Sequence, residues 1–196
     1  MADELELKAV VDDAAALHAR LAAGGAVAGF AGRMEDRRYD RAGELTARDE
    51  VVRVRTFHHR DGPVEARVSW KGPTGRAPGG YKRREEIELA AEGAESPGAL
   101  LERLGYSVVH AIDRDVEYFT LAGATLRLER YPRMDLLLEI EGDAATIERA
   151  IAATGIPRAA FTPDTLADFA ARYEARTGRT AVLAGEVGRR TAELSR

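Results

Sequence analysis

Long charged side chains alternate with apolar ones at the start of this sequence, in a pattern that could bind a metal ion and phosphate. Glu4, Glu6 and Lys8 alternate with Leu5 and Leu7. Side chains of a β-strand point alternately to opposite faces, so the three charged residues would share one face. Carboxylates are ligands for hard divalent cations, and lysine binds phosphate oxygens. The spacing therefore predicts a strand that carries both kinds of ligand on one side.

The same alternation recurs in five later segments, each with apolar residues on the opposite face. The polar residues that share a face are, segment by segment, Arg53 and Arg55; Arg67, Ser69 and Lys71; Arg84, Glu86 and Glu88; Arg127 and Glu129; and Glu139 and Glu141. A half-buried sheet with its polar face in water is the ordinary explanation. Two features favour an enclosed face instead: the charged residues are long Glu, Arg and Lys, and they sort by strand into acidic and basic pairs. Enclosed charges are costly without partners, and a divalent metal with a polyphosphate would supply both signs.

The elements that must position these residues are mostly strands. Apolar alternation predicts strands at about 4–10, 27–38, 51–58, 64–72, 82–90, 107–116, 125–131 and 135–141, with a loop from Pro73 to Gly80. Strands dominate and helices lie at connections, so the predicted fold class is α+β with a mainly antiparallel sheet. Eight strands can close into a barrel.

Helices are predicted from their capping residues. Asp12 or Asp13 begins a helix that Gly24-Gly25 stops, Ser96-Pro97 begins one that Gly105 ends, Asp143 begins one that ends at Gly155, and Thr162-Pro163 begins one that ends at Gly178. We expect one domain over residues 1–180 and a helical tail over 181–196.

Composition narrows the class of protein. The chain has 196 residues, 45% of them apolar and 32% charged, with a net charge of −4. The acidic balance argues against a nucleic-acid partner, and no apolar run is long enough for a membrane span. Without cysteine there is no disulfide or zinc–thiolate site. No signal peptide is recognisable, so a cytoplasmic location is expected. The four histidines have no metal-ligand spacing and are given no role.

An ordered series of motifs resembles the CYTH, or triphosphate tunnel, family. Glu4-Leu5-Glu6-Leu7-Lys8 resembles its Glu-x-Glu-x-Lys signature. The other matching segments are, in family order, Asp36-Arg37-Arg38-Tyr39-Asp40, Leu45 with Val52-Arg53-Val54-Arg55, Ser69-Trp70-Lys71-Gly72-Pro73, Arg84-Glu85-Glu86-Ile87-Glu88, Leu101 to Tyr106, and Glu139-Ile140-Glu141. The resemblance spans about residues 3–178.

The resemblance implies an eight-stranded antiparallel β-barrel flanked by helices, with Mg²⁺ or Mn²⁺ on glutamates and a triphosphate on basic residues. The metal set it implies is Glu4, Glu6, Glu129, Glu139 and Glu141. The phosphate set is Lys8, Arg53, Arg55, Lys71, Arg84, Arg114 and Arg127. Lys8, Glu4 and Glu6 are the catalytic candidates, and Glu86 and Glu88 support the others.

One segment departs from the family pattern. The family carries Lys-x-Arg on the strand after the Leu101–Tyr106 motif, where this chain has Ile112-Asp113-Arg114-Asp115. Arg114 is displaced by one in this comparison, and a shift of one residue turns a side chain to the other face of a strand. The lost cations could weaken phosphate binding, and Arg127 could compensate.

The expected function is that of a class IV adenylyl cyclase-like enzyme, which converts ATP to cyclic AMP and pyrophosphate. A triphosphatase acting on tripolyphosphate, thiamine triphosphate or a nucleotide is the first alternative. A binding module that holds nucleotide or polyphosphate without turnover is the second, and a structural domain with a wet charged face is the third. A homodimer is compatible with the sequence, which does not set the oligomeric state.

Overall fold

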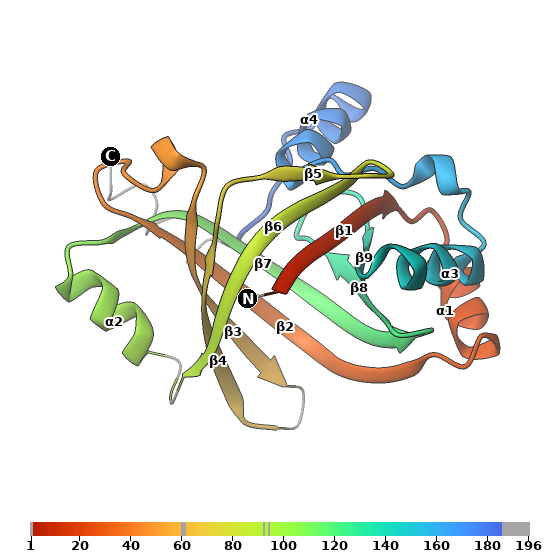
Figure 1. Cartoon of the computed structure of the whole chain (residues 1–196), viewed down its shortest axis with the longest axis horizontal. Helices are drawn as coiled ribbons and strands as arrows, with labels where there is room; N and C mark the ends of the chain where they lie inside the picture. The colour runs from red at the N-terminus through yellow and green to blue at the C-terminus, as the bar shows by residue number, and fades with distance from the viewer. Residues whose placement is uncertain (1, 60–61, 92, 94, 186–196) are drawn as a thin grey trace.

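A closed, antiparallel β-barrel forms the body of the protein (Figure 1). The computed structural model describes residues 2–59, 62–91, 93 and 95–185, with side chains from residue 5 onward. In chain order the elements are β1 (Ala2–Val10), α1 (Ala14–Ala23), β2 (Val27–Asp40), η1 (Thr46–Arg48), β3 (Val51–His59), β4 (Val64–Lys71), β5 (Gly75–Ala77), β6 (Tyr81–Ala91), α2 (Ser96–Arg103), β7 (Ser107–Leu121), β8 (Ala124–Arg130), β9 (Leu137–Gly142), α3 (Ala144–Thr154), η2 (Arg158–Ala160) and α4 (Leu166–Thr177).

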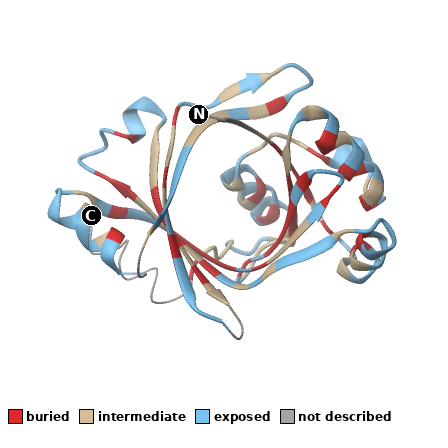
Figure 2. Ribbon diagram, turned by 60° about the horizontal axis from the view of Figure 1, so that its bottom comes forward, coloured by how far each residue is buried: buried red, intermediate tan, exposed pale blue. Residues whose placement is uncertain are grey.

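Eight of the strands close the ring. Their order is β1-β9-β8-β7-β2-β3-β4-β6, and β6 pairs back onto β1, from Ala2 opposite Glu86 to Glu6 opposite Lys82. Figure 2 shows this ring from a direction closer to its axis. The fold class and the eight-stranded antiparallel barrel expected from the sequence are confirmed.

The main hydrophobic core lies outside the ring. Leu7, Leu126, Leu138 and Ile140 are almost wholly buried on the outer faces of β1, β8 and β9, and they pack with residues of α1 and α3 such as Ile147. A smaller outer cluster of Tyr39, Val54 and Val108 packs with Leu101 of α2 and Tyr106. Because the apolar faces of β1, β8 and β9 pack outside the ring, their charged faces line the interior.

Capping residues begin most helices as expected. The Asp13 side chain accepts from Ala16 N at the start of α1, and Asp143 accepts from Thr146 N at the start of α3. Gly155 ends α3 with φ of 70°, in the left-handed region that favours glycine. For α2, the N-cap is Glu95 rather than Ser96, one residue before the expected position.

Two local predictions were wrong. The last helix begins at Leu166 after a Thr165–Asp168 capping box, not at Thr162-Pro163. The Thr162 backbone instead exchanges hydrogen bonds with Lys8 of β1, at 2.9 and 2.8 Å, which holds it extended. The expected loop from Pro73 to Gly80 also contains β5, which pairs with Tyr81–Arg83 and turns at Gly79 and Gly80, both with positive φ.

The chain beyond α4 returns to the barrel. Val182 forms a bridge with Arg133, and Asp113 N of β7 donates to Leu183 O at 2.7 Å. Residues 181–185 are therefore extended rather than helical. The rest of the expected tail helix, residues 186–196, lies outside the described residues. Among the described helices, none is long and apolar enough to cross a membrane.

Candidate functional site

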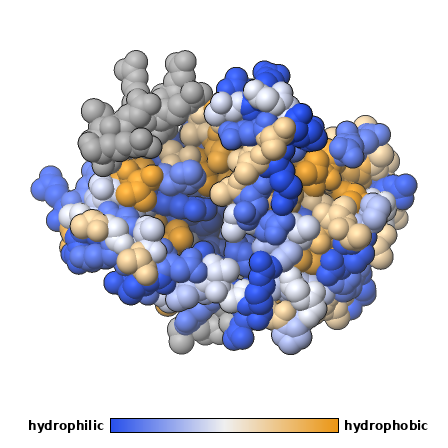
Figure 3. All heavy atoms as spheres, turned by 90° about the horizontal axis from the view of Figure 1, so that it is seen from above, coloured by the Kyte–Doolittle hydropathy of each residue, from blue (hydrophilic) through white to orange (hydrophobic). Residues whose placement is uncertain are grey.

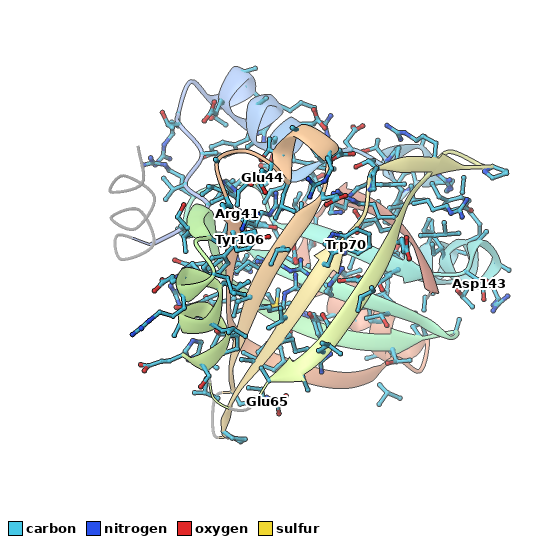
Figure 4. All side chains as sticks on the ribbon, turned by 60° about the vertical axis from the view of Figure 1, so that its left-hand side comes forward. Arg41, Glu44, Glu65, Trp70, Tyr106 and Asp143 are labelled. Carbon is cyan, nitrogen blue, oxygen red and sulfur yellow. The ribbon has the colours of Figure 1, made fainter. Side chains whose placement is uncertain are left out.

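The inward side chains enclose a first cavity of about 440 Å³. It opens toward η1 and α4, at the end of the barrel where Figure 4 labels Glu44. Figure 3, seen from the α4 side, shows hydrophilic side chains around a hollow there. The charged residues described in its wall are nine cations, Lys8, Arg38, Arg53, Arg55, Lys71, Lys82, Arg84, Arg114 and Arg127, and five carboxylates, Glu6, Asp36, Asp49, Glu129 and Glu139. The wall is thus strongly positive, although the whole chain carries −4.

A second cavity of about 340 Å³ continues along the barrel toward the β3–β4 turn, where Figure 4 labels Glu65. Arg53, Arg55 and Arg127 line both cavities and mark the boundary between them. The second cavity adds Phe57 and Tyr118. Their rings are 6.3 Å apart, so this half of the interior offers aromatic surface beside cations.

Asp36 of β2 is the centre of an arginine cluster in the first cavity. Arg55 donates to its two carboxylate oxygens at 2.7 and 3.1 Å, and both terminal nitrogens of Arg114 donate to Oδ2 at 3.1 Å. Arg53 NH1 lies 3.7 Å from the same oxygen. Burial raises the pKa of Asp36, but Arg55 and Arg114 outweigh it and hold that pKa well below its usual value. The carboxylate therefore orients arginines whose charge exceeds its own.

Glu129 of β8 extends this cluster. It accepts from Arg114 Nε at 2.9 Å and from the Tyr131 hydroxyl at 2.5 Å. Burial alone would raise the pKa of Glu129, but Arg114 and then Arg127 lower it. Glu129 thus lies with the arginines, and both of its oxygens already accept hydrogen bonds.

A second cluster joins β1 to β9 around Lys8. Lys8 Nζ lies 2.7 Å from Glu6 Oε1 and 2.8 Å from Glu139 Oε2. Lys82 also contacts Glu6, and Arg127 contacts Glu139. Burial raises the pKa of Glu6, but Lys8 and Lys82 hold it well below its usual value.

Carboxylate chemistry at Lys8 fits a hard divalent cation. Glu6 and Glu139 bring oxygens from neighbouring strands to one point, and carboxylate oxygens are ligands that Mg²⁺ and Mn²⁺ prefer. Glu4 is opposite Arg84 in the β1–β6 register, and its side chain lies outside the described residues. Within the described residues, no three histidine or carboxylate side chains gather as a metal site. The five-glutamate metal set stays a prediction.

The other residues expected at the site lie around the same interior. Lys71 Nζ is 3.0 Å from Glu86, which also accepts from Arg53 at 3.4 Å. Arg84 donates to Gly72 O at 2.6 Å and contacts Asp49. In the second cavity, Glu88 pairs with Arg67 at 2.8 Å, and Glu141 with Arg127 at 3.1 Å. Glu86 thus holds two of the cations expected to bind phosphate, whereas Glu88 pairs with Arg67, which is not among them.

Arg114 faces the interior despite the departure of its segment from the family pattern. It is buried between Asp36 and Glu129, and Ile112 lines the same cavity. Asp113, on the opposite face, pairs with Arg37 at 2.6 Å. The alternation along β7 therefore places Ile112 and Arg114 in the cavity wall and Asp113 on the other face.

Asp36, Arg38 and Lys82 line the first cavity and were missed from the sequence. Each is two residues from a charged neighbour on the same face: Asp36 from Arg38, and Lys82 from Arg84. The alternation rule used elsewhere would have found them. His110, given no role, also lines this cavity; burial and then Arg38 lower its pKa.

Solved structures share this fold. A "putative adenylate cyclase" from Vibrio parahaemolyticus is 17% identical with a TM-score of 0.69, covering 85% of this chain and 96% of that one. PH1819 from Pyrococcus horikoshii is 22% identical with a TM-score of 0.66, covering 90% and 99%. HpAC1 from Hippeastrum, described as a "putative adenylyl cyclase" with a dominant triphosphatase activity, is 18% identical with a TM-score of 0.60, covering 91% and 97%.

No protein-family model and no curated protein sequence matches this chain. At these identities the structural matches show the fold. They confirm the resemblance to CYTH-type proteins at that level, and they leave the residues and the reaction to be argued from the site.

Proposed function

We propose that this protein is a metal-dependent enzyme that acts on a triphosphate, as a class IV adenylyl cyclase-like enzyme converting ATP to cyclic AMP and pyrophosphate. The observation that carries the proposal is the excess of cations in the first cavity, nine against five carboxylates among the described side chains. Buried like charges repel one another and lose hydration. A bound polyanion relieves both costs, which is what a triphosphate provides.

The cations divide into two groups by their partners. Arg55 and Arg114 are held by Asp36, so their positions are fixed before a ligand enters. Arg53 is buried, and its pKa is lowered to about 10 by burial and then by Arg55. An anion beside Arg53 would restore its stability as a cation, and its planar guanidinium can donate to two phosphate oxygens. Lys71 and Arg84 lie on the same cavity wall.

The acidic side at Lys8 would hold the metal. Glu6 and Glu139, with Glu4, are the residues proposed to bind Mg²⁺ or Mn²⁺, which would neutralise charge on the phosphate oxygens. Lys8 would then be released toward the substrate, since it lies between the two carboxylates. Phosphoryl chemistry depends chiefly on such positioning and charge neutralisation.

The second cavity supports a nucleotide as the substrate. Phe57 and Tyr118 bring aromatic rings to this cavity beside Arg67 and Arg127, and a base could pack against them. Arg53, Arg55 and Arg127 connect this cavity with the cationic one. In cyclisation, the ribose 3′ oxygen forms a bond to the α-phosphorus while losing its proton. The bond from that phosphorus to the bridging oxygen breaks, and pyrophosphate leaves. The nucleoside and the phosphates would thus occupy different halves of the interior.

Triphosphate hydrolysis is the second candidate. The similarity to HpAC1, described as having a dominant triphosphatase activity, supports it, and the first cavity alone provides the cations that it needs. In hydrolysis a water oxygen bonds to the terminal phosphorus, and the remaining diphosphate leaves.

One assay separates these reactions. Pure protein is incubated with Mn²⁺ and ATP, tripolyphosphate or thiamine triphosphate, and the products are resolved. Cyclic AMP with pyrophosphate supports cyclisation, and ADP or free phosphate supports hydrolysis. Binding without turnover would identify a binding module. If the protein neither binds nor turns over any of these triphosphates, the proposal is overturned. Arg53→Gln should abolish the activity, and Arg33→Gln, on the outer face of β2, should not.

A further inference from the structure

Arg38 of β2 lies beside His110 and Ile112 of β7 in the wall of the first cavity. In the β2–β7 register Asp36 is opposite Ile112, and Arg38 is opposite His110. Ile112, Arg38 and His110 all line the first cavity. The apolar Ile112 carries no charge at this part of the wall. Arg38 therefore brings a positive charge to the same wall from the neighbouring strand.

Unlike the other arginines of this cavity, Arg38 has no hydrogen-bond or ion-pair partner among the described residues. Its Nε is buried and makes no hydrogen bond. The nearest carboxylate on its own strand face, Asp36, already accepts from Arg55 and Arg114. Burial lowers the pKa of Arg38, and nearby Arg114 and Arg84 lower it further, against the effect of Asp36. The Arg38 side chain is half-buried, and its buried Nε lacks a hydrogen bond, which is costly. A bound anion is the partner that this geometry favours.

The position of Arg38 within the cavity indicates which part of a ligand it would meet. Arg53, Arg55 and Arg127 line both cavities and mark the inner end of the first. Arg38 instead shares a smaller surface pocket with Asp49, Val51 and His110, so it lies toward the outer mouth. A linear polyphosphate that begins at the inner arginines would reach Arg38 with its far end.

We propose that Arg38 binds the outermost phosphate of a triphosphate held in the first cavity, and thereby makes the site select three phosphates over two. This inference rests on the proposed triphosphate function. It assigns a ligand to a cavity arginine whose buried Nε has no hydrogen-bond partner.

Calorimetric titration of the full chain with tripolyphosphate and with pyrophosphate tests the proposal. Arg38→Gln should weaken tripolyphosphate binding about tenfold, the effect of losing one charge-assisted contact. Pyrophosphate binding should change less than about twofold, because the shorter anion does not reach the mouth. Arg38→Lys should recover part of the loss. Arg33→Gln, an exposed arginine on the same strand, is the matched control.

Thermal melting of the ligand-free variants excludes a structural explanation. Arg38→Gln removes an unpaired charge, so its melting temperature should equal or exceed that of the unmodified protein, while its shift on adding tripolyphosphate shrinks. Equal losses for both anions, an unchanged tripolyphosphate affinity, or a lower melting temperature without ligand would overturn the inference.

If Arg53→Gln abolishes binding while Arg38→Gln does not, the proposed function stands and only the role of Arg38 fails. If the unmodified protein binds neither anion, the proposed function fails first.

Discussion

Arg55 holds Asp36 with two nitrogens, Nε at 2.7 Å and NH2 at 3.1 Å, inside a barrel whose interior is otherwise crowded with positive charge. Both side chains are at least nine-tenths buried. Because Arg114 uses the same carboxylate, Asp36 fixes two cations that the substrate would meet.

Asp36→Asn should therefore destabilise the protein by about 3–5 kcal/mol, the usual cost of leaving buried charges without their partner. The free energy of unfolding, from urea denaturation at pH 7, measures this. Glu65→Gln, at an exposed position beside the β3–β4 turn, is the control and should change it by less than about 0.5 kcal/mol. A loss of under 1 kcal/mol for Asp36→Asn would show that the cluster does not depend on this carboxylate.

The same carboxylate predicts how stability depends on pH. The pKa of Asp36 is lower in the folded state than in the unfolded chain, where it is about 3.9. Its contribution is thus complete above that pH and is lost as the pH falls toward the folded value. Urea unfolding between pH 7 and pH 3 should show the difference between the unmodified protein and Asp36→Asn shrinking below about pH 4. A difference that stays constant over that range would contradict the assignment.

The carboxylates at Lys8 predict the metal dependence. Glu139→Gln removes one of the two charges that meet at Lys8 Nζ, so Mn²⁺-dependent turnover should fall at least about tenfold and need more Mn²⁺ for half-maximal rate. Chelation by EDTA should abolish turnover in the unmodified protein. Glu117→Gln, a half-exposed glutamate on the outer face of β7, is the control. An unchanged Mn²⁺ requirement in Glu139→Gln would place the metal elsewhere.

If the second cavity holds a base, Tyr118 should matter for a nucleotide substrate and not for an inorganic one. Tyr118→Leu removes a ring face from the second cavity, and stacking on an aromatic ring contributes about 1–3 kcal/mol per base. The ratio kcat/KM for ATP should fall about fivefold or more, while that for tripolyphosphate stays within about twofold. Tyr118→Phe keeps the ring and should behave like the unmodified protein. Equal losses for both substrates would mean that the second cavity does not hold the base.

The barrel could be predicted because strand alternation fixes two faces at once. Leu5 and Leu7 required a dry side, which left Glu6 and Lys8 on the other side. In the structure the sheet curls with this apolar side outward, because Leu7 and Ile140 pack with α1 and α3 outside the ring. Local capping chemistry also sufficed for Asp13 and Asp143, because their hydrogen bonds span only three residues.

What the sequence could not supply depends on contacts between distant segments. Thr162 looked like a helix start, yet its backbone pairs with Lys8, more than 150 residues earlier in the chain. Comparison with the family pattern left Arg114 facing the wrong way, whereas in the structure it lies on the inner face of β7 and donates to Asp36. The missing partner of Arg38 is visible only when all of its neighbours are placed.

The seam between β1 and β6 has a consequence for how the chain assembles. β1 is made before both of its neighbours, which come much later in the chain: β6 begins at Tyr81 and β9 ends at Gly142. The backbone groups of β1 therefore lack these two partner strands until the chain has been made through β6 and then through β9. Closing the ring joins sequence-distant ends, which makes this step slow. A segment that pairs with β1 early would compete with ring closure.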